Sequence, residues 1–207
     1  MKKFALLLIL FVLGSCSLLD SSRSNNSLFY YHFSEKVYLN VNKKLLFVSF
    51  DHAQSCSNFI SNLNAIPSLK VWNSDNPYFM QHGHTNNLVV ESKKNKISDD
   101  IISSINHRPD VQYLSPVVDK QGELIFVSNQ FSVKLKSDQD FNKLENLVRD
   151  TNCKLENCDY APNGVYYVKC LKESKLNAIQ MSVLYYETDL FDYCSPHFMY
   201  PISTFVQ

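Results

Sequence analysis

Two stretches of the chain decide its fold: Asp110-Val111-Gln112-Tyr113-Leu114-Ser115-Pro116 and Leu190-Phe191-Asp192-Tyr193-Cys194-Ser195-Pro196. Both place a tyrosine two residues before a Ser-Pro pair, and Ser115 and Ser195 lie 80 residues apart. A segment that recurs in this way indicates an internal duplication, in which one supersecondary unit is present twice. The elements before each stretch are therefore predicted as two matching series.

The two series follow the same order of hydrophobic patterns, because alternating apolar residues predict strands and apolar spacings of three and four predict helices. In the first copy, strands are predicted over 36–41, 45–50, 69–72 and 87–91, and helices after caps at Ser55 or Ser57 and at Ser98. In the second copy, strands are predicted over 123–127, 130–136, 153–157 and 165–170, and helices after caps at Asp138 and Ser174. Polar turns at 42–44 and 128–129 are predicted to separate the first two strands of each copy.

The resulting order is strand, helix, strand, strand, helix, strand, with one additional leading strand in each copy. That is the order of the split βαβ or ferredoxin-like arrangement. We therefore expect an α+β protein with two tandem ferredoxin-like βαββαβ repeats, whose antiparallel sheets carry their helices on one face. The first repeat is predicted over 29–118 and the second, with a C-terminal tail, over 119–207, joined by the polar turn 119–122.

The N-terminal residues have the order of a bacterial lipoprotein signal. Lys2 and Lys3 precede an apolar run over 4–13, which is too short to span a bilayer, and Leu13-Gly14-Ser15-Cys16 reads as a lipobox. We predict a signal peptide over 1–15, lipid on Cys16 and a flexible Ser- and Asn-rich tether over 16–28. The alternative is an ordinary signal peptide with an incidental cysteine.

A lipid on Cys16 would hold the protein at a membrane of the bacterial cell envelope, provided that more than one acyl chain is attached. The residues that follow, Ser17-Leu18-Leu19-Asp20, lack the acidic cluster associated with surface export. We therefore expect a membrane-anchored lipoprotein of the outer membrane, on its periplasmic side rather than at the cell surface.

Composition excludes several classes of function. The chain has 20 basic and 20 acidic residues, and loss of Lys2 and Lys3 with the signal leaves 18 and 20, so no nucleic-acid partner is expected. Four glycines leave few places for a strained catalytic turn, and no Gly-x-Ser-x-Gly is present, which predicts a protein that is not an enzyme. No small-molecule cofactor is expected. His82-Gly83-His84 is either half of a metal site or part of a solvated connection, and no metal is predicted because further ligands are not apparent.

Five cysteines are left once the anchor is set aside, so at least one is unpaired in a compartment that permits disulfides. If 165–170 pairs antiparallel with 153–157, Cys153 lies opposite Cys170 and Leu155 opposite Val168. Lys154 then lies opposite Lys169, a like-charge pair that counts against the register. Cys153 and Cys170 are either a disulfide or two buried free thiols, the state in which unoxidised cysteine is commonly found.

Several segments resemble the N-terminal prodomain region of subtilisin-like serine proteases of Bacteroidetes-type bacteria. These segments are residues 30–39, YYHFSEKVYL, residues 115–123, SPVVDKQGE, and residues 165–168, 184–188 and 190–198. The resemblance covers nearly the whole chain after the signal, and we expect this protein to lack the protease domain, with its Asp, His and Ser, that follows in those precursors. It implies a prodomain-like module, and prodomains of this class fold their enzyme and block its active-site cleft.

The uncharged segment Phe198-Met199-Tyr200-Pro201-Ile202-Ser203-Thr204-Phe205-Val206-Gln207 is a candidate for partner binding. Such a tail can lie extended in a protease cleft and add a strand to its edge. In the resembling prodomains, the residues after the closing strand thread the enzyme's cleft. The side chains expected to bind are Phe198, Met199, Tyr200, Pro201, Ile202 and Phe205. The alternative is a frayed or self-packed terminus.

The leading hypothesis is a non-enzymatic lipoprotein that binds a subtilisin-like serine protease as an inhibitor or folding chaperone. The competing hypothesis is a structural or interaction lipoprotein of the envelope, or the remnant of a protease precursor without inhibitory activity. The third hypothesis, an enzyme, is the least favoured by the sequence.

Overall fold

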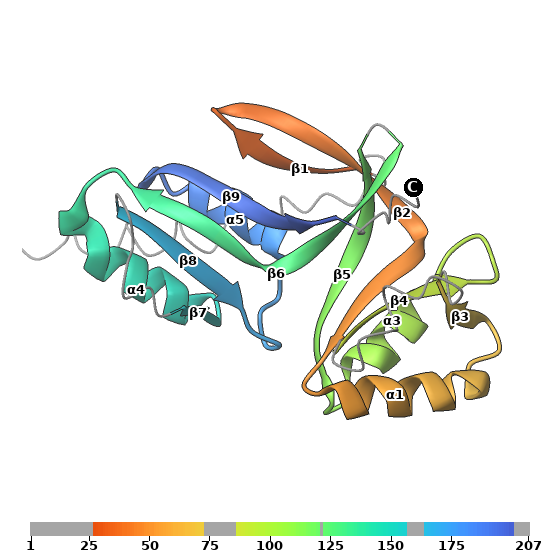
Figure 1. Ribbon diagram of the computed structural model, residues 1–207. Helices are drawn as coiled ribbons and strands as arrows, with labels where there is room; N and C mark the ends of the chain where they lie inside the picture. Colours follow the sequence, from red (N-terminus) through yellow and green to blue (C-terminus); the bar gives the residue numbers. More distant parts are fainter. Residues whose placement is uncertain (1–26, 73–85, 121, 157–163, 201–207) are drawn as a thin grey trace, which may run out of the picture.

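The computed structural model describes residues 27–72, 86–120, 122–156 and 164–200, and Figure 1 shows two halves side by side. The first half contains β1 (Ser27–His32), β2 (Glu35–Phe50), α1 (Ala53–Asn62), the short 3-10 helix η2 (Leu63–Ala65), β3 (Leu69–Val71), β4 (Asn87–Ser92), α3 (Asp99–Asn106) and β5 (Val111–Lys120). The second contains β6 (Glu123–Leu135), the 3-10 helix η3 (Asp138–Asp140), α4 (Phe141–Asp150), β7 (Cys153–Leu155), β8 (Val165–Cys170), α5 (Ala178–Tyr186) and β9 (Phe191–Met199).

The strands form one nine-stranded sheet in the order β3-β4-β2-β5-β6-β8-β7, with β1 paired to β2 and β9 paired to β6. Every pairing within it is antiparallel. The hairpin of β5 and β6, in which Val117 lies opposite Phe126, joins the two halves (Figure 1). The expected α+β class is confirmed, with a mostly antiparallel sheet and four α-helices among the described residues.

The turns predicted at 42–44 and 128–129 are wrong, because β2 and β6 are continuous strands that bend there. Pairing with β5 shifts between Asn42 and Leu46, and pairing of β6 with β9 shifts between Val127 and Phe131. Polar residues mark these bulges because residues at a bulge leave the regular ladder. The Ser-Pro pairs sit at the same irregularities, since Pro116 lies opposite Leu46 and Pro196 opposite Phe131. Proline lacks a backbone N–H and is tolerated in sheets at such sites.

The core lies between the sheet and the helices in each half. In the first half, α1 and α3 cover the face of β2 that carries Leu46, Val48 and Phe50. In the second half, α4 and α5 cover the face of β6 that carries Phe131 and Val133. A smaller cluster lies on the opposite face of the sheet where the halves meet, formed by Leu45, Phe47, Val89, Val117 and Phe126.

The hairpin of β1 and the first residues of β2 packs against the second half, although the predicted division of the chain assigns it to the first. Tyr30 and Leu39 are buried in the same cluster as the core residues of α5 and β6. In Figure 1 the hairpin, drawn in orange, lies over β9 and α5. The ring centroids of Tyr30 and Phe198 are 5.3 Å apart. The core of the second half therefore includes residues from the beginning of the chain, which precede the core residues of the first half in the sequence.

The predicted helix caps are correct at one site. Ser98 is the N-cap residue of α3, although its side chain makes no capping hydrogen bond. Helix α1 begins at Ala53, before Ser55, and Asp138 lies within η3, which Ser137 caps.

Ser174 does not cap α5, because its hydroxyl donates to the carbonyl of Thr151 at 3.0 Å. Asn177 caps this helix instead, in a capping box with Gln180. Within the described segments, no helix is long and apolar enough to cross a bilayer.

Candidate interaction surface

Strand β9 lies at the edge of the second half. It pairs with β6 from Phe191 to Met199, and no other described strand pairs with it. An edge strand presents unpaired backbone N–H and C=O groups to which an extended segment can add. This edge continues directly into the predicted binding tail.

The structure places the first three tail residues and leaves the others outside the described ranges. Phe198 lies opposite Val127 and Met199 opposite Phe126, so both belong to β9. Tyr200 follows the strand and is 57% exposed. Pro201, Ile202 and Phe205 lie outside the described residues. Phe198 and Met199 are half-buried, whereas Tyr200 is exposed to solvent.

The tip of the β1–β2 hairpin presents an aromatic side chain to solvent. His32 pairs with Glu35, so the turn consists of Phe33 and Ser34, with φ of 46° and 68°. Positive φ at both residues is the geometry of a type I′ turn, which favours Asn and Gly. Phe33 is nevertheless 88% exposed. An exposed aromatic ring on a strained turn is the kind of feature found at binding sites.

A hollow of about 430 Å³ lies between this turn and β9. It is lined by Tyr31, His32, Phe33, Ser34, Tyr186, Asp192, Tyr193 and Ser195. The rings of Tyr31 and Tyr186 are stacked with centroids 4.3 Å apart, and the Tyr186 hydroxyl donates to Oγ of Ser34 at 3.0 Å. These contacts hold the hairpin against the end of α5. Tyrosine-rich hollows of this kind are favoured at protein interfaces.

The Tyr31 hydroxyl donates to Oε1 of Glu187 at 3.1 Å. Burial and the neighbouring Glu187 carboxylate both raise the pKa of Tyr31, which therefore stays protonated as a hydrogen-bond donor. The ammonium of Lys36 lies 4.5 Å from the centroid of Phe29 on the outer side of the hairpin. The hairpin is consequently aromatic on its outer face as well as at its tip.

The candidate interaction surface has a third part, in addition to edge strand β9 and the tip of the β1–β2 hairpin. This part is the face of the sheet that points away from α4 and α5. Tyr167 and His197 are in edge-to-face contact with centroids 5.5 Å apart, and Ser132 lies opposite both Tyr167 and Ser195. Burial lowers the pKa of His197, so this imidazole is neutral at pH 7. The same face carries charged side chains, and Lys134 is paired with Asp192 at 3.6 Å.

We expect Phe33→Gly to raise the free energy of unfolding by about 1 kcal/mol, because glycine adopts positive φ without a steric cost. The ring is solvent-exposed, so its removal forfeits little buried area. Phe33→Ala is the control, since it removes the ring but keeps the backbone cost. Urea denaturation of both variants measures the difference, and equal midpoints for glycine and alanine would contradict the strained turn.

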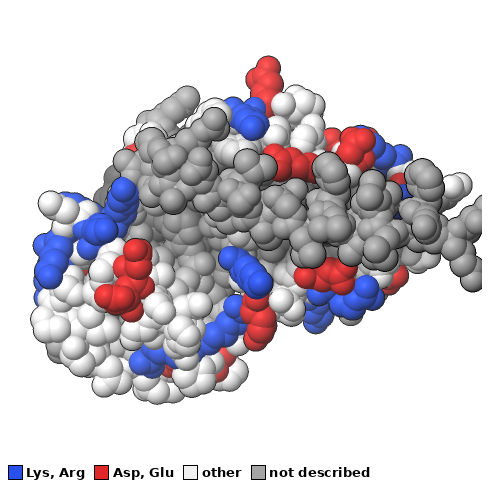
Figure 2. Space-filling model, turned by 180° about the vertical axis from the view of Figure 1, so that it is seen from behind, with Lys and Arg blue, Asp and Glu red and all other residues white. Residues whose placement is uncertain are grey.

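A second hollow lies between the halves, where α3 faces the N-terminal end of α5. Two adjoining cavities of about 410 and 440 Å³ share Asp99, Ile102, Leu114 and Asn177 in their walls. The Lys172 ammonium donates to the carbonyl of Arg108 and connects the halves at this place. On the face drawn in Figure 2, blue and red side chains are interspersed, in agreement with the even balance of charge in the sequence.

The predicted register of β7 and β8 is confirmed, with Cys153 opposite Cys170 and Leu155 opposite Val168. Both cysteines are buried free thiols. Lys154 does lie opposite Lys169, and the 3.7 Å contact between Lys169 and Glu156 relieves this like-charge pair.

Other predicted sites lie outside the described residues. These are the lipidation site Cys16 and the histidines His82 and His84. Cys158 lies outside them too. Among the described side chains, no group of three or more His, Cys, Asp and Glu could hold a metal ion.

No family model matches the chain, and no curated protein sequence matches it. The arguments for function consequently rest on the residues and their geometry.

Sequence reasoning missed the hairpin tip and the Tyr31–Tyr186 stack. The available signal was the density of aromatic residues over 29–33, which is unusual for a solvent-facing strand pair. The partner of Tyr31 is 155 residues away in the chain, so its identity could be found only from the packing of α5 against β1.

Proposed function

We propose that this protein is a non-enzymatic lipoprotein of the bacterial envelope that binds a subtilisin-like serine protease as an inhibitor or folding chaperone. One observation carries the proposal: edge strand β9 runs without interruption from the core of the second half into the uncharged tail. A tail that leaves a fixed edge strand starts in an extended conformation, which lowers the entropy lost on binding.

The proposed fold assignment is two ferredoxin-like βαββαβ repeats. Within the sheet, the strands of the first half are ordered β3-β4-β2-β5, and those of the second half are ordered β7-β8-β6-β9. Strands β2, β3, β4 and β5 of the first half therefore occupy the same places in the sheet as β6, β7, β8 and β9 of the second half. The bulges beside Pro116 and Pro196 support the same equivalence.

In this proposal the second half and the β1–β2 hairpin packed against it present three elements to the protease. The face with Tyr167 and His197 packs on the enzyme, the aromatic turn at Phe33 lies beside it, and the tail from Tyr200 occupies the cleft. Because residues 198–207 contain no charged side chain, the cleft that accepts them is apolar.

The test mixes the intact protein with subtilisin-like proteases of the same cell and follows peptide hydrolysis. We expect inhibition with a stable complex, and removal of 200–207 should abolish inhibition while leaving β9 in place. A variant with Ser203 and Thr204 replaced by alanine is the matched control, since it keeps the length and the apolar side chains of the tail.

Unchanged hydrolysis and no complex with any of these proteases would refute the proposal. The protein would then be interpreted as an interaction lipoprotein of the envelope or a precursor remnant. If inhibition survives the loss of residues 200–207, we would infer that the sheet face and Phe33 bind the protease and that the tail does not.

A further inference from the structure

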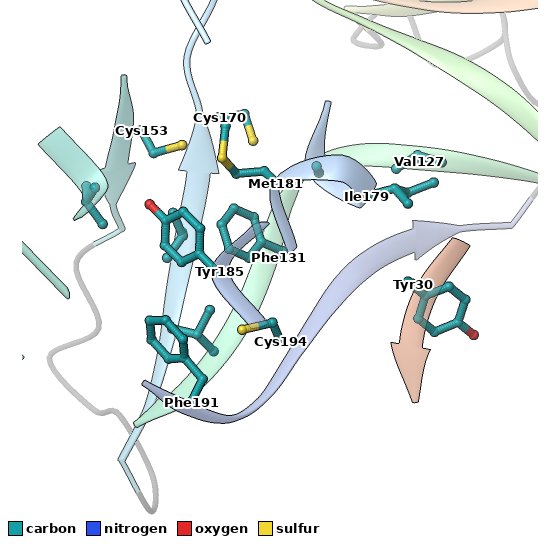
Figure 3. Close-up of a cluster of buried hydrophobic side chains, with 14 of the residues drawn as sticks. Tyr30, Val127, Phe131, Cys153, Cys170, Ile179, Met181, Tyr185, Phe191 and Cys194 are labelled. Carbon is teal, nitrogen blue, oxygen red and sulfur yellow. The ribbon is translucent and has the colours of Figure 1, made fainter. Parts of the chain in front are cut away.

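Two thiols, those of Cys153 and Cys170, face each other across β7 and β8. Their strands are antiparallel neighbours, and Figure 3 shows Cys153 and Cys170 beside each other at one end of the core cluster of the second half. The other buried cysteine of this cluster, Cys194, lies opposite Val133 in a different strand pair. Among the described residues, Cys153 and Cys170 are therefore the only two cysteines that lie directly opposite each other on neighbouring strands.

The hydrogen bonds of the ladder decide whether this register suits a disulfide. The backbone N–H of Leu171 donates to the carbonyl of Asn152 at 3.3 Å, so this adjacent pair is hydrogen-bonded. Because the two kinds of pair alternate along an antiparallel ladder, Cys153 and Cys170 form a non-hydrogen-bonded pair. Such pairs have Cα atoms about 4.5 Å apart, within the range of about 4.4–6.8 Å that a disulfide spans.

The contact between the two sulfurs favours ionisation of Cys153. The Sγ of Cys153 also lies 3.8 Å from the carbonyl oxygen of Thr151, to which the thiol donates, and 3.8 Å from Oγ of Ser174. A hydrogen bond from Cys170 lowers the pKa of Cys153 to about 6, and the same bond raises the pKa of Cys170. The lower-pKa thiol is the one expected to attack first.

The position of β7 also provides access. It has three residues and is the outermost strand of the sheet, so it can open locally without unfolding the rest of the half. Cys194 lies in the longer, nine-residue strand β9, and burial raises the pKa of its thiol.

We propose that Cys153 and Cys170 are a redox modification site, oxidised to a cross-strand disulfide by thiol–disulfide exchange with a protein or small-molecule disulfide. The Cys153 thiolate attacks one sulfur of that disulfide, forming a mixed disulfide and releasing one thiolate. Cys170 then loses its proton, attacks the sulfur of Cys153 and releases the second thiolate. Two thiols of this chain are oxidised by two electrons, and one external disulfide is reduced to two thiols, which take up the protons.

The experiment treats the intact protein with oxidised glutathione, blocks the remaining thiols and digests it with trypsin without reduction. The expected product is peptide 150–154 joined to peptide 170–172, with a loss of two hydrogen atoms. Cys158 would appear in the separate peptide 155–169, so its cross-links are distinguishable. Loss of the linked pair on adding dithiothreitol confirms the bond.

Cys170→Ser should eliminate the linked pair and leave Cys153 as a stable mixed disulfide with glutathione. Cys194→Ser is the matched control, and it should give the same linked pair as the wild type. The melting temperature should rise on oxidation in the wild type and in Cys194→Ser but not in Cys153→Ser. For each variant, the melting temperature of the oxidised form is compared with that of its own reduced form. A change in stability caused by the substitution itself therefore does not affect the result.

The proposal is overturned if both thiols survive an excess of oxidised glutathione, or if the cross-link joins Cys158 to either of them. It does not depend on the proposed protease partner, since no protease takes part in the measurement.

Discussion

Replacing Tyr185 with alanine is expected to lower the free energy of unfolding by about 3–5 kcal/mol. The side chain is fully buried and lies at the centre of the cluster in Figure 3. Its ring is 4.9 Å from that of Phe131 in edge-to-face contact and 5.7 Å from that of Phe191. Truncation leaves a cavity between α5 and the sheet that these rings cannot fill.

Tyr185→Phe is the control, because it keeps the ring and removes only the hydroxyl, which lies 2.9 Å from Oγ1 of Thr151. The expected loss is about 1 kcal/mol. Urea denaturation followed by circular dichroism measures both variants, and fluorescence of Trp72 reports on the first half in the same sample. A loss below about 1 kcal/mol for alanine would contradict the central position assigned to Tyr185.

Replacing Cys16 with alanine is expected to move the protein from the membrane fraction to the soluble fraction. The reason is that the proposed acyl chains on Cys16 are the anchor, and a chain without them loses their contribution of about 0.8 kcal/mol per buried CH₂. The measurement separates membranes by centrifugation and labels cells with a fatty-acid analogue. Both the label and membrane retention should disappear together.

Ser17→Ala is the matched control for the anchor, since it changes the next residue and leaves the thiol. It should keep the label and the membrane association. Membrane retention of the Cys16→Ala protein would refute the lipid anchor and return the N-terminus to the alternative of an ordinary signal peptide.

The features predicted correctly depend on local patterns. The α+β class and the pairing of Cys153 with Cys170 follow from alternation and spacing within about twenty residues. The start of α3 after Ser98 was also predicted correctly, because a capping residue precedes an amphipathic run.

The features that were missed depend on contacts between distant residues. A polar stretch such as 42–44 has the composition of a turn, and only pairing with β5 shows that the strand continues through it. Asn177 rather than Ser174 caps α5, because the Ser174 hydroxyl already donates to the carbonyl of Thr151 at the end of α4. The packing of the β1–β2 hairpin against α5 is likewise set by residues more than 140 positions away, such as Tyr31 and Tyr186.

The contact between β1 and β9 has a mechanical consequence. The predicted tether enters the fold at Ser27, and the tail leaves it after Met199, on two strands whose side chains Tyr30 and Phe198 touch. A pulling force between an anchored N-terminus and a partner gripping the tail would pass through this short path. The first half, with α1 and α3, would carry little of that load and could keep its fold while the linkage is under tension.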